Sequence, residues 1–263
     1  MIEPVAQEEA LQQAKILVSA VAGVEPAVLA IHADMALSPE QLADLGDMLS
    51  RRVKREPLQY ILGEWEFFGL PFYADARALI PRQDTELLVQ AAIERIRRRG
   101  YQTCLDLCTG SGCVGICIAK QTGIDVTASD ISADALALAG ENAERNEVRL
   151  AWIESDLFRQ IDEKYDLIVC NPPYLSLADM QALQPELAFE PRIALYGGGD
   201  GLDFYRKIAW DYPAHLRPGG ALLLEIGNTQ AEAAAALFDA STSVLRDYSG
   251  NPRVLVVEEG PSE

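Results

Sequence analysis

The segment Asn171-Pro172-Pro173-Tyr174 combines residue types that can bind a planar group carrying an NH2. Asn171 supplies a side-chain carbonyl, the two prolines stiffen the loop, and Tyr174 supplies an aromatic face. The NH2 of an amide or of adenine can donate two hydrogen bonds to carbonyl oxygens while its plane lies against the ring. The residue types therefore indicate a site for such a group, although a plain turn that ends a strand also fits these four residues.

A second candidate site is the loop at residues 108–112, which contains Gly110 and Gly112. Glycines let the backbone approach a ligand closely and direct amide N–H groups at it. About 20 residues farther along, Asp130 ends a predicted strand, where a carboxylate can accept hydrogen bonds from ribose hydroxyls. A nucleoside-containing cofactor is therefore predicted, and its expected contacts in the loop are Cys108, Thr109, Gly110, Ser111 and Gly112.

The glycine spacing and Asp106 narrow the type of cofactor. The loop lacks the three spaced glycines of the dinucleotide fingerprint. A carboxylate at Asp106, just before the loop, is unfavourable beside a pyrophosphate but favourable near an ammonium or a sulfonium group. S-Adenosylmethionine is therefore predicted rather than NAD. Asp156 and Leu157, which follow the next strand, would contact its adenine, although Asp156 could instead cap the following turn.

The elements that position these residues alternate between strands and helices from residue 101 onwards. Polar segments follow the predicted strands at 103–107, 125–129, 149–153 and 165–170. Repeated βα units imply a mostly parallel sheet with helices on both faces, and ligands bind at the C-terminal ends of its strands. Two strands between residues 243 and 257 would add one antiparallel strand. The predicted fold class is therefore α/β and Rossmann-like.

Three segments differ in character along the chain. Residues 1–62 have helical apolar spacing, and Ser38 is a predicted N-cap. We interpret them as a helical substrate-recognition domain, with a simple packing subdomain as the open alternative. Residues 63–80 are aromatic and predict a hairpin linker. Residues 81–263 form the predicted α/β domain, whose first helix Thr85 or Asp84 would cap.

Composition limits the classes of partner. The chain has 263 residues, 49% of them apolar, and a net charge of −18. Such acidity argues against unaided nucleic-acid binding, because phosphate contacts need clustered Lys and Arg. No apolar run of about 18 residues predicts a membrane span, and the N-terminus lacks a signal-peptide pattern. The five cysteines form no Cys-x-x-Cys pair, which favours reduced thiols in a cytoplasmic protein over a metal site.

Several motifs resemble those of one family, the release factor glutamine methyltransferases, which modify a glutamine in class I peptide chain release factors. The resemblance covers nearly the whole chain beyond residue 57. Its most specific part is Ile80-Pro81-Arg82-Gln83-Asp84-Thr85-Glu86, in which Gln83-Asp84 departs from the usual Pro-Glu. The other matching segments are 57–63, 67–69, 108–112, 130–132, 171–174, 190–191, 198–202 and 224–227.

The resemblance implies a Rossmann-like S-adenosylmethionine-dependent methyltransferase sheet with a small N-terminal helical domain. It also implies that the Asn171 side-chain O and the Pro172 backbone O accept the two N–H bonds of a substrate glutamine, with Tyr174 stacked on the amide plane. Pro173 and Arg82 would complete the substrate site, although Arg82 and Glu190 could equally form a structural ion pair. Asn171 would also contact the cofactor. The implied protein is a cytoplasmic monomer that binds class I release factors and neither a membrane nor nucleic acid directly.

Two other functions remain open at this point. Asn-Pro-Pro-Tyr also occurs in nucleic-acid adenine amino-group methyltransferases, in which the base would have to be flipped into the pocket. The net charge of −18 argues against this alternative. A catalytically silent binding module with the same fold is the other, and cofactor binding without methyl transfer to any substrate would support it.

Overall fold

The computed structural model describes residues 4–32 and 35–258, which form two compact units. The first unit comprises Met1–Gly63 and Pro185–Phe189, and the second comprises Glu64–Gln184 and Glu190–Glu263. The cavity described below lies wholly in the second unit.

The first unit is helical. It contains α1 (Pro4–Ala22), η1 (Pro26–His32), α2 (Pro39–Val53), α3 (Leu58–Leu62) and η3 (Pro185–Phe189). The predicted cap of α2 is confirmed, because the Ser38 hydroxyl accepts a hydrogen bond from the Gln41 backbone N at 3.2 Å. Glu186 of η3 pairs with Arg52 at 3.0 Å and with Arg55 at 2.8 Å. These ion pairs explain why η3, although distant in sequence, belongs to this unit.

The described part of the second unit contains a 7-stranded sheet with the order β5-β4-β3-β6-β7-β9-β8. The strands from β5 to β7 in this order pair in parallel, whereas β9 pairs antiparallel with β7 and β8. The mostly parallel sheet with one antiparallel terminal strand is thus confirmed. The strands are β3 (Thr103–Leu107), β4 (Asp125–Asp130), β5 (Ala151–Glu154), β6 (Tyr165–Cys170), β7 (Leu216–Glu225), β8 (Ser241–Arg246) and β9 (Pro252–Glu258).

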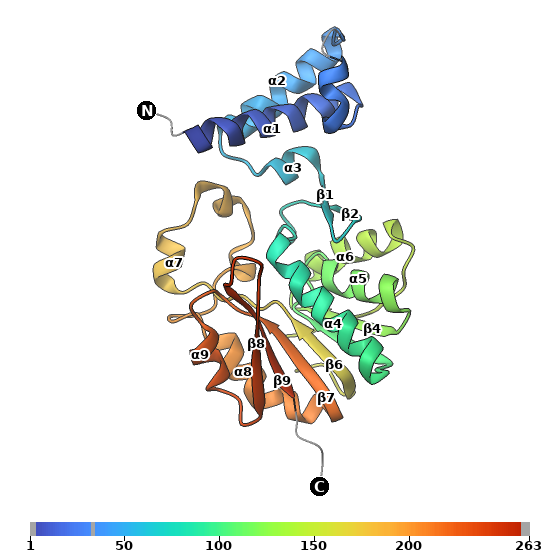
Figure 1. The fold of residues 1–263 in the computed structure, drawn as a ribbon, viewed down its shortest axis with the longest axis vertical. Coiled ribbons are helices and arrows are strands. Elements are labelled where there is room, and N and C mark those ends of the chain that lie inside the picture. The colour runs from blue at the N-terminus through green and yellow to red at the C-terminus, as the bar shows by residue number, and fades with distance from the viewer. Residues whose placement is uncertain (1–3, 33–34, 259–263) are drawn as a thin grey trace. The chain divides into compact units, whose positions relative to one another are not determined.

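Helices cover both faces of this sheet. Alternate residues of β6 enter different cores: Leu167 and Val169 join the cluster of α4 and α5, whereas Ile168 and Cys170 join the cluster of α8 and α9. Figure 1 shows α4 and α5 together on one side of the strands and α8 and α9 on the other. The helices are α4 (Glu86–Arg99), α5 (Cys113–Thr122), α6 (Ala133–Arg145), α7 (Leu177–Gln181), α8 (Asp203–His215) and α9 (Ala231–Ala235).

A two-stranded hairpin precedes the sheet in the same unit. Its strands are β1 (Glu64–Phe67) and β2 (Leu70–Tyr73), which pair antiparallel. Phe67 and Phe72 are buried in the cluster that contains α4 and α5. Their burial attaches the hairpin to the sheet unit.

One helix differs from its prediction in length. The pattern from residue 230 to 239 predicts a helix, but α9 ends at Ala235. Leu237 and Phe238 then donate backbone hydrogen bonds three residues back, to Ala234 and Ala235. The last turn is therefore tighter than an α-helix, and it places Phe238 in the core.

The cysteine and membrane predictions can be compared with the described residues. All five cysteines are free thiols, and all but Cys108 are buried. Over residues 4–32 and 35–258, no group of three or more His, Cys, Asp or Glu side chains is arranged to hold a metal ion. None of the helices in these ranges is both long and apolar enough to cross a membrane.

Candidate active site

A cavity of about 340 Å³ lies at the C-terminal ends of β3, β4, β5 and β6. This is the edge at which open α/β sheets bind ligands. Ten of the predicted site residues line it: Arg82, Cys108, Thr109, Gly110, Ser111, Asp130, Asp156, Leu157, Asn171 and Pro173. The three others, Gly112, Pro172 and Tyr174, do not line it.

Asp106 provides a buried carboxylate in the cavity wall. Its Oδ2 accepts hydrogen bonds from the Thr109 hydroxyl at 2.6 Å and from the Gly115 backbone N at 2.9 Å. Burial raises the pKa of this carboxyl to about 7, against the two hydrogen bonds, which lower it. A cation bound nearby would stabilise the ionised form.

Asp130 connects the end of β4 to the glycine loop. Its Oδ2 accepts from the Gly110 backbone N at 2.9 Å, and its Oδ1 accepts from the Ser132 backbone N at 3.0 Å. Burial raises the pKa of Asp130 above its ordinary value. Each carboxylate oxygen can accept a further hydrogen bond, so the side chain retains capacity for ligand hydroxyls.

Gly112 has a packing role behind the cavity wall. Its φ is 81°, which places it in the left-handed region at the start of α5. A Cβ there would lie 2.9 Å from Ile116 Cδ1 and 3.0 Å from Ala139 Cβ. Only glycine therefore fits between α5 and α6 without displacing a neighbour.

Two residues of the cavity lining hold an unusual backbone conformation. Cys108 has a φ of 59° and Leu157 a φ of 52°. A non-glycine residue in the left-handed region costs on the order of 1 kcal/mol or more, and such residues are concentrated at functional sites. Both follow the ends of strands, where the chain turns sharply to enclose the cavity.

The turn after β5 is closed by Ser155. Its hydroxyl donates to the Leu157 backbone O at 2.6 Å and accepts from the Gln160 backbone N at 3.0 Å. Ser155 thus occupies the capping role considered for Asp156. The Asp156 carboxylate lines the cavity and lies 3.5 Å from the Arg159 guanidinium.

The Asn171 side chain lies in the cavity wall, and its NH2 is directed at Thr85. Its Nδ2 donates to the Thr85 hydroxyl oxygen at 3.3 Å. Thr85 stands at the N-cap position of α4 as predicted, but its side chain makes no capping hydrogen bond. The hydroxyl therefore serves Asn171 instead of the helix.

The residues after Asn171 are held by close backbone contacts. Pro172 and Pro173 are buried, and the Tyr174 backbone O accepts from Gln230 Nε2 at 2.9 Å. A Cβ at Gly197 would lie 2.6 Å from the Pro173 backbone O, so glycine is needed for this approach. The Tyr174 ring packs against the α8 and α9 cluster.

Arg82 is fixed by a buried partner. Its guanidinium forms an ion pair with Glu190, whose side chain is 1% exposed. The other carboxylate oxygen of Glu190 accepts from the Ile80 backbone N at 3.0 Å. Glu190 therefore holds two positions of the 80–86 segment at the cavity wall.

Comparison with known proteins identifies the family. A family model described as "PrmC N-terminal domain" matches residues 4–63, and a "Methyltransferase small domain" model matches residues 83–202. A release factor glutamine methyltransferase of Geobacter sulfurreducens is 45% identical, covering 88% of this chain and 82% of that protein. Another, of Cereibacter sphaeroides, is 42% identical, covering 94% and 91% respectively. The chain belongs to the release factor glutamine methyltransferase family.

Solved structures of other proteins share the fold of this family member. A methyltransferase from Pyrococcus furiosus has a TM-score of 0.55 at 18% identity, covering 85% of this chain and all of that one. A T. thermophilus 16S rRNA methyltransferase in complex with AdoMet and guanosine has a TM-score of 0.52 at 19% identity, covering 75% of this chain and 50% of that one. The methyltransferase fold predicted from the sequence is thus confirmed.

The sequence reasoning gave no site role to several residues around the cavity of this methyltransferase, and it considered Thr85 only as a helix cap. Thr85, Phe204 and Lys207 line it, and buried Glu225 lies behind Thr85. Thr85 and Glu225 fall in motifs that carry the family resemblance, which is the signal that could have marked them. Phe204 and Lys207 have no motif of their own, and only the packing of α8 brings them to the cavity.

Proposed function

We propose that this chain transfers a methyl group from S-adenosylmethionine to the side-chain amide nitrogen of the glutamine in the Gly-Gly-Gln loop of class I release factors. The observation that carries the proposal is the orientation of Asn171. Because its NH2 donates to Thr85, its carbonyl oxygen remains available to accept a hydrogen bond from a substrate amide. Family membership supports the choice of substrate.

The cofactor half of the cavity fits S-adenosylmethionine. Asp106 offers a buried carboxylate to a cation, and Asp130 offers acceptor capacity to ribose hydroxyls. Leu157 and Ile131 line the cavity with apolar surface that suits an adenine ring. When bound, the cofactor supplies an electrophilic methyl group on a sulfonium. Cys108, Thr109, Gly110, Ser111, Asp156 and Asn171 complete the proposed cofactor contacts.

The acceptor half of the cavity, which contains Asn171, binds and orients the group that receives the methyl. This group is a weak nucleophile. An amide nitrogen is poorly nucleophilic because its lone pair is delocalised into the carbonyl. The Asn171 Oδ1 and the Pro172 backbone O accept its two N–H bonds and stabilise the positive charge that develops on it. Pro173 and Arg82 line this half, and we propose that Tyr174, which packs against the α8 and α9 cluster outside the lining, lies against the amide plane once the substrate is bound. Alignment of this kind supplies as much as about 7–11 kcal/mol.

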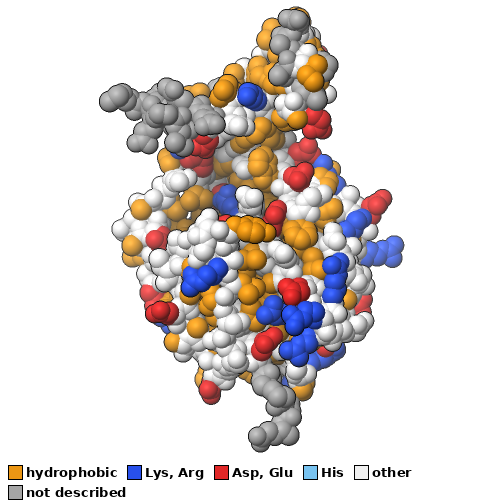
Figure 2. Space-filling view, in the orientation of Figure 1, with side chains coloured by type: hydrophobic (Ala, Val, Ile, Leu, Met, Phe, Trp, Pro, Cys, Tyr) orange, Lys and Arg blue, Asp and Glu red, His pale blue; other side chains and the backbone are white. Residues whose placement is uncertain are grey.

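The location and partners follow from the same proposal. Release factors act in translation, which places this enzyme in the cytoplasm. It works as a monomer, and residues 1–62 serve as its recognition domain for the release factor. Figure 2 shows Lys and Arg interspersed with Asp and Glu on the face in view, and the net charge is −18. Neither feature favours direct binding of nucleic acid.

The test is mass spectrometry of a purified release factor incubated with this protein and S-adenosylmethionine. We expect one methyl group on the Gly-Gly-Gln glutamine, which Asn171→Ala abolishes. Gln121→Ala, which truncates an exposed amide at the end of α5, is the matched control and leaves the modification intact. An unmodified factor, alongside methylated adenine in a parallel nucleic-acid assay, would contradict the proposal.

A further inference from the structure

Three side chains from distant segments meet at the acceptor half of the cavity, where Thr85 and Asn171 belong to the lining. Thr85 ends η2 (Gln83–Thr85), Asn171 follows β6, and Glu225 ends β7. Thr85 is 2% exposed and Glu225 3% exposed. The Thr85 hydroxyl accepts from Asn171 Nδ2 at 3.3 Å, and a side-chain interaction with Thr85 lowers the pKa of the Glu225 carboxyl, against the larger effect of burial, which raises it.

The hydrogen bonds among these three side chains have only one consistent direction when Glu225 is ionised, a form that burial confines to a pH of about 7 and above by raising the pKa of Glu225 to about 7. A carboxylate can only accept, so the Thr85 hydroxyl donates its single proton to Glu225. The oxygen of Thr85 can then only accept, and it accepts from the NH2 of Asn171. If the Asn171 amide were flipped, two acceptor oxygens would face one another, and the NH2 would face the substrate's own N–H donors.

We infer that Thr85 and Glu225 are positioning residues, which fix the Asn171 amide with its oxygen toward the substrate nitrogen. This inference rests on the proposed function, and it adds the residues that set the orientation of the Asn171 amide. Neither residue needs to touch the substrate, because each acts through the next side chain. Asn171 alone would have no preference between its two amide orientations.

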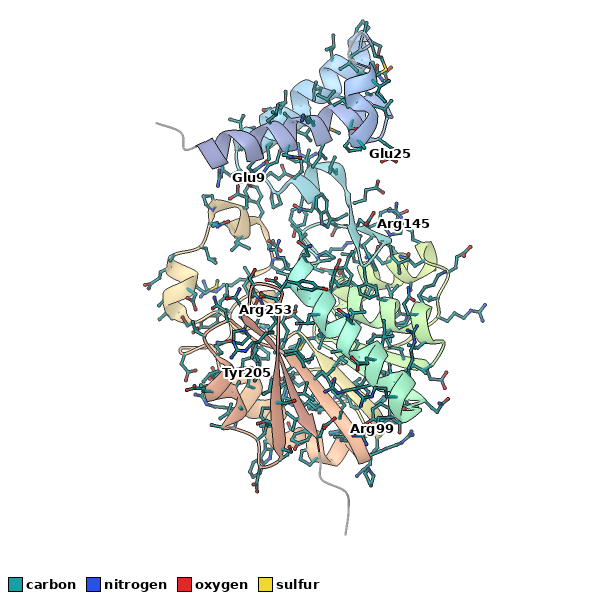
Figure 3. The ribbon with its side chains drawn as sticks, in the orientation of Figure 1. Glu9, Glu25, Arg99, Arg145, Tyr205 and Arg253 are labelled. Atoms are coloured by element: carbon teal, nitrogen blue, oxygen red, sulfur yellow. The ribbon has the colours of Figure 1, made fainter. Side chains whose placement is uncertain are left out.

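The backbone and surroundings of Glu225 hold it in place for this role. Its backbone O accepts from the buried Tyr205 hydroxyl at 2.9 Å, and Tyr205 is labelled in Figure 3. An interaction with the Tyr174 side chain also lowers the pKa of the Glu225 carboxyl. Arg253, labelled in the same figure, is the second residue of β9 and pairs with Asp84 at 2.9 Å. Glu225 thereby links η2 and the Asn171–Tyr174 loop at the same wall.

The kinetic test uses matched variants of Thr85. Thr85→Val keeps the shape but removes the hydroxyl, whereas Thr85→Ser keeps the hydroxyl. With a release factor as substrate, we expect Thr85→Val and Glu225→Gln to lower kcat about 10- to 100-fold, as loss of a partner behind a site residue does elsewhere. Thr85→Ser should retain kcat within about threefold, and the KM for S-adenosylmethionine should change less than about threefold in every variant.

A double variant separates positioning from general destabilisation. Because the two residues act as one unit, Thr85→Val combined with Glu225→Gln should be no slower than the slower single variant. The melting temperature and calorimetric affinity for S-adenosylmethionine show whether each variant is folded. A Thr85→Val enzyme with wild-type kcat, or losses that multiply in the double variant, would overturn the inference.

A measurement without release factor keeps this inference separate from the proposed function. In isotope-labelled protein, the side-chain NH2 of Asn171 should exchange slowly with solvent by NMR, and it is assigned by its absence in Asn171→Asp. Thr85→Val should speed that exchange, and Thr85→Ser should preserve it. Unchanged exchange in Thr85→Val overturns the positioning role. A release factor that the wild type leaves unmodified, with exchange altered as expected, contradicts only the proposed function.

Discussion

Two buried carboxylates differ in their relation to the cavity: Asp106 lines its cofactor half, whereas Glu225 lies outside the lining, behind Thr85. Burial is the largest cause for both and raises the pKa of each to about 7. Asp106 has its partners on its own strand-loop-helix segment, Thr109 and Gly115. Glu225 instead faces Thr85 and Tyr174, which belong to two other segments. The hydrogen-bond partners of Asp106 thus come from one continuous stretch of chain, whereas the groups that act on Glu225 come from other stretches.

The hydrogen bonds of the carboxylate oxygens also differ between Asp106 and Glu225. Asp106 Oδ2 has two hydrogen-bond donors within 2.9 Å. Glu225 Oε2 is buried and has no hydrogen-bond partner among the described residues. A buried acceptor without a partner costs about 1–3 kcal/mol.

The largest effect is expected in the acceptor half. Asn171→Ala should lower kcat by about 10²–10³, the loss seen when one aligned hydrogen-bonding group of a reaction site is removed. The affinity for S-adenosylmethionine should fall far less, because the residues of the glycine loop are unchanged. Single-turnover methylation and calorimetry measure the two quantities. Equal losses in kcat and in the affinity for S-adenosylmethionine would contradict the division of the cavity into a cofactor half and an acceptor half.

The cofactor half should respond in the opposite way to the loss of its carboxylate. Asp106→Asn keeps the shape but removes the charge, and the affinity for S-adenosylmethionine should fall about 10- to 100-fold, as for a lost charged hydrogen bond. Glu225→Gln is the matched control outside the cofactor half and should leave this affinity within about threefold. A larger loss in Glu225→Gln than in Asp106→Asn would contradict the assignment of Asp106 to the cofactor.

A smaller effect on stability is expected at Gly112. Gly112→Ala places a Cβ 2.9 Å from Ile116 at a φ of 81°, so the free energy of unfolding should fall by about 1–3 kcal/mol. Gly140→Ala is the control, because that α6 position has no atom within 4 Å of an added Cβ. It should raise stability by up to about 1 kcal/mol. Urea unfolding checks both, and similar losses in the two variants would contradict the packing role.

The smallest expected effect, taken per pH unit, is the change of the free energy of unfolding with pH. The pKa of Asp106 is raised in the folded state, so its stabilising effect is complete below about pH 4 and is lost as the pH rises through about 7. Between these limits the free energy of unfolding should fall by at most about 1.4 kcal/mol per pH unit because of this group. In Asp106→Asn that part of the slope should disappear. Unfolding curves of the unliganded proteins measure the difference, and identical slopes would be inconsistent with a buried, neutralised Asp106.

Much of the fold followed from local patterns. The apolar run at residues 165–170 predicts a strand, and β6 has the bounds Tyr165–Cys170. The glycine loop and Asp130 also act within neighbouring βα units, so their convergence on one cavity could be expected from strand order. The extent of α9 could not, because the burial of Phe238 sets how that helix ends.

The sequence by itself determined which residue types could bind an amide and a sulfonium cofactor, and at which ends of strands they would stand. Only the tertiary structure decided that Thr85 serves Asn171 rather than the helix it precedes, and that Glu225 lies behind both. The physical reason is that a hydroxyl at the start of a helix can hydrogen-bond to the backbone of that helix, so sequence patterns alone predict a cap. The direction in which its single proton points depends on a carboxylate that folding alone brings within reach.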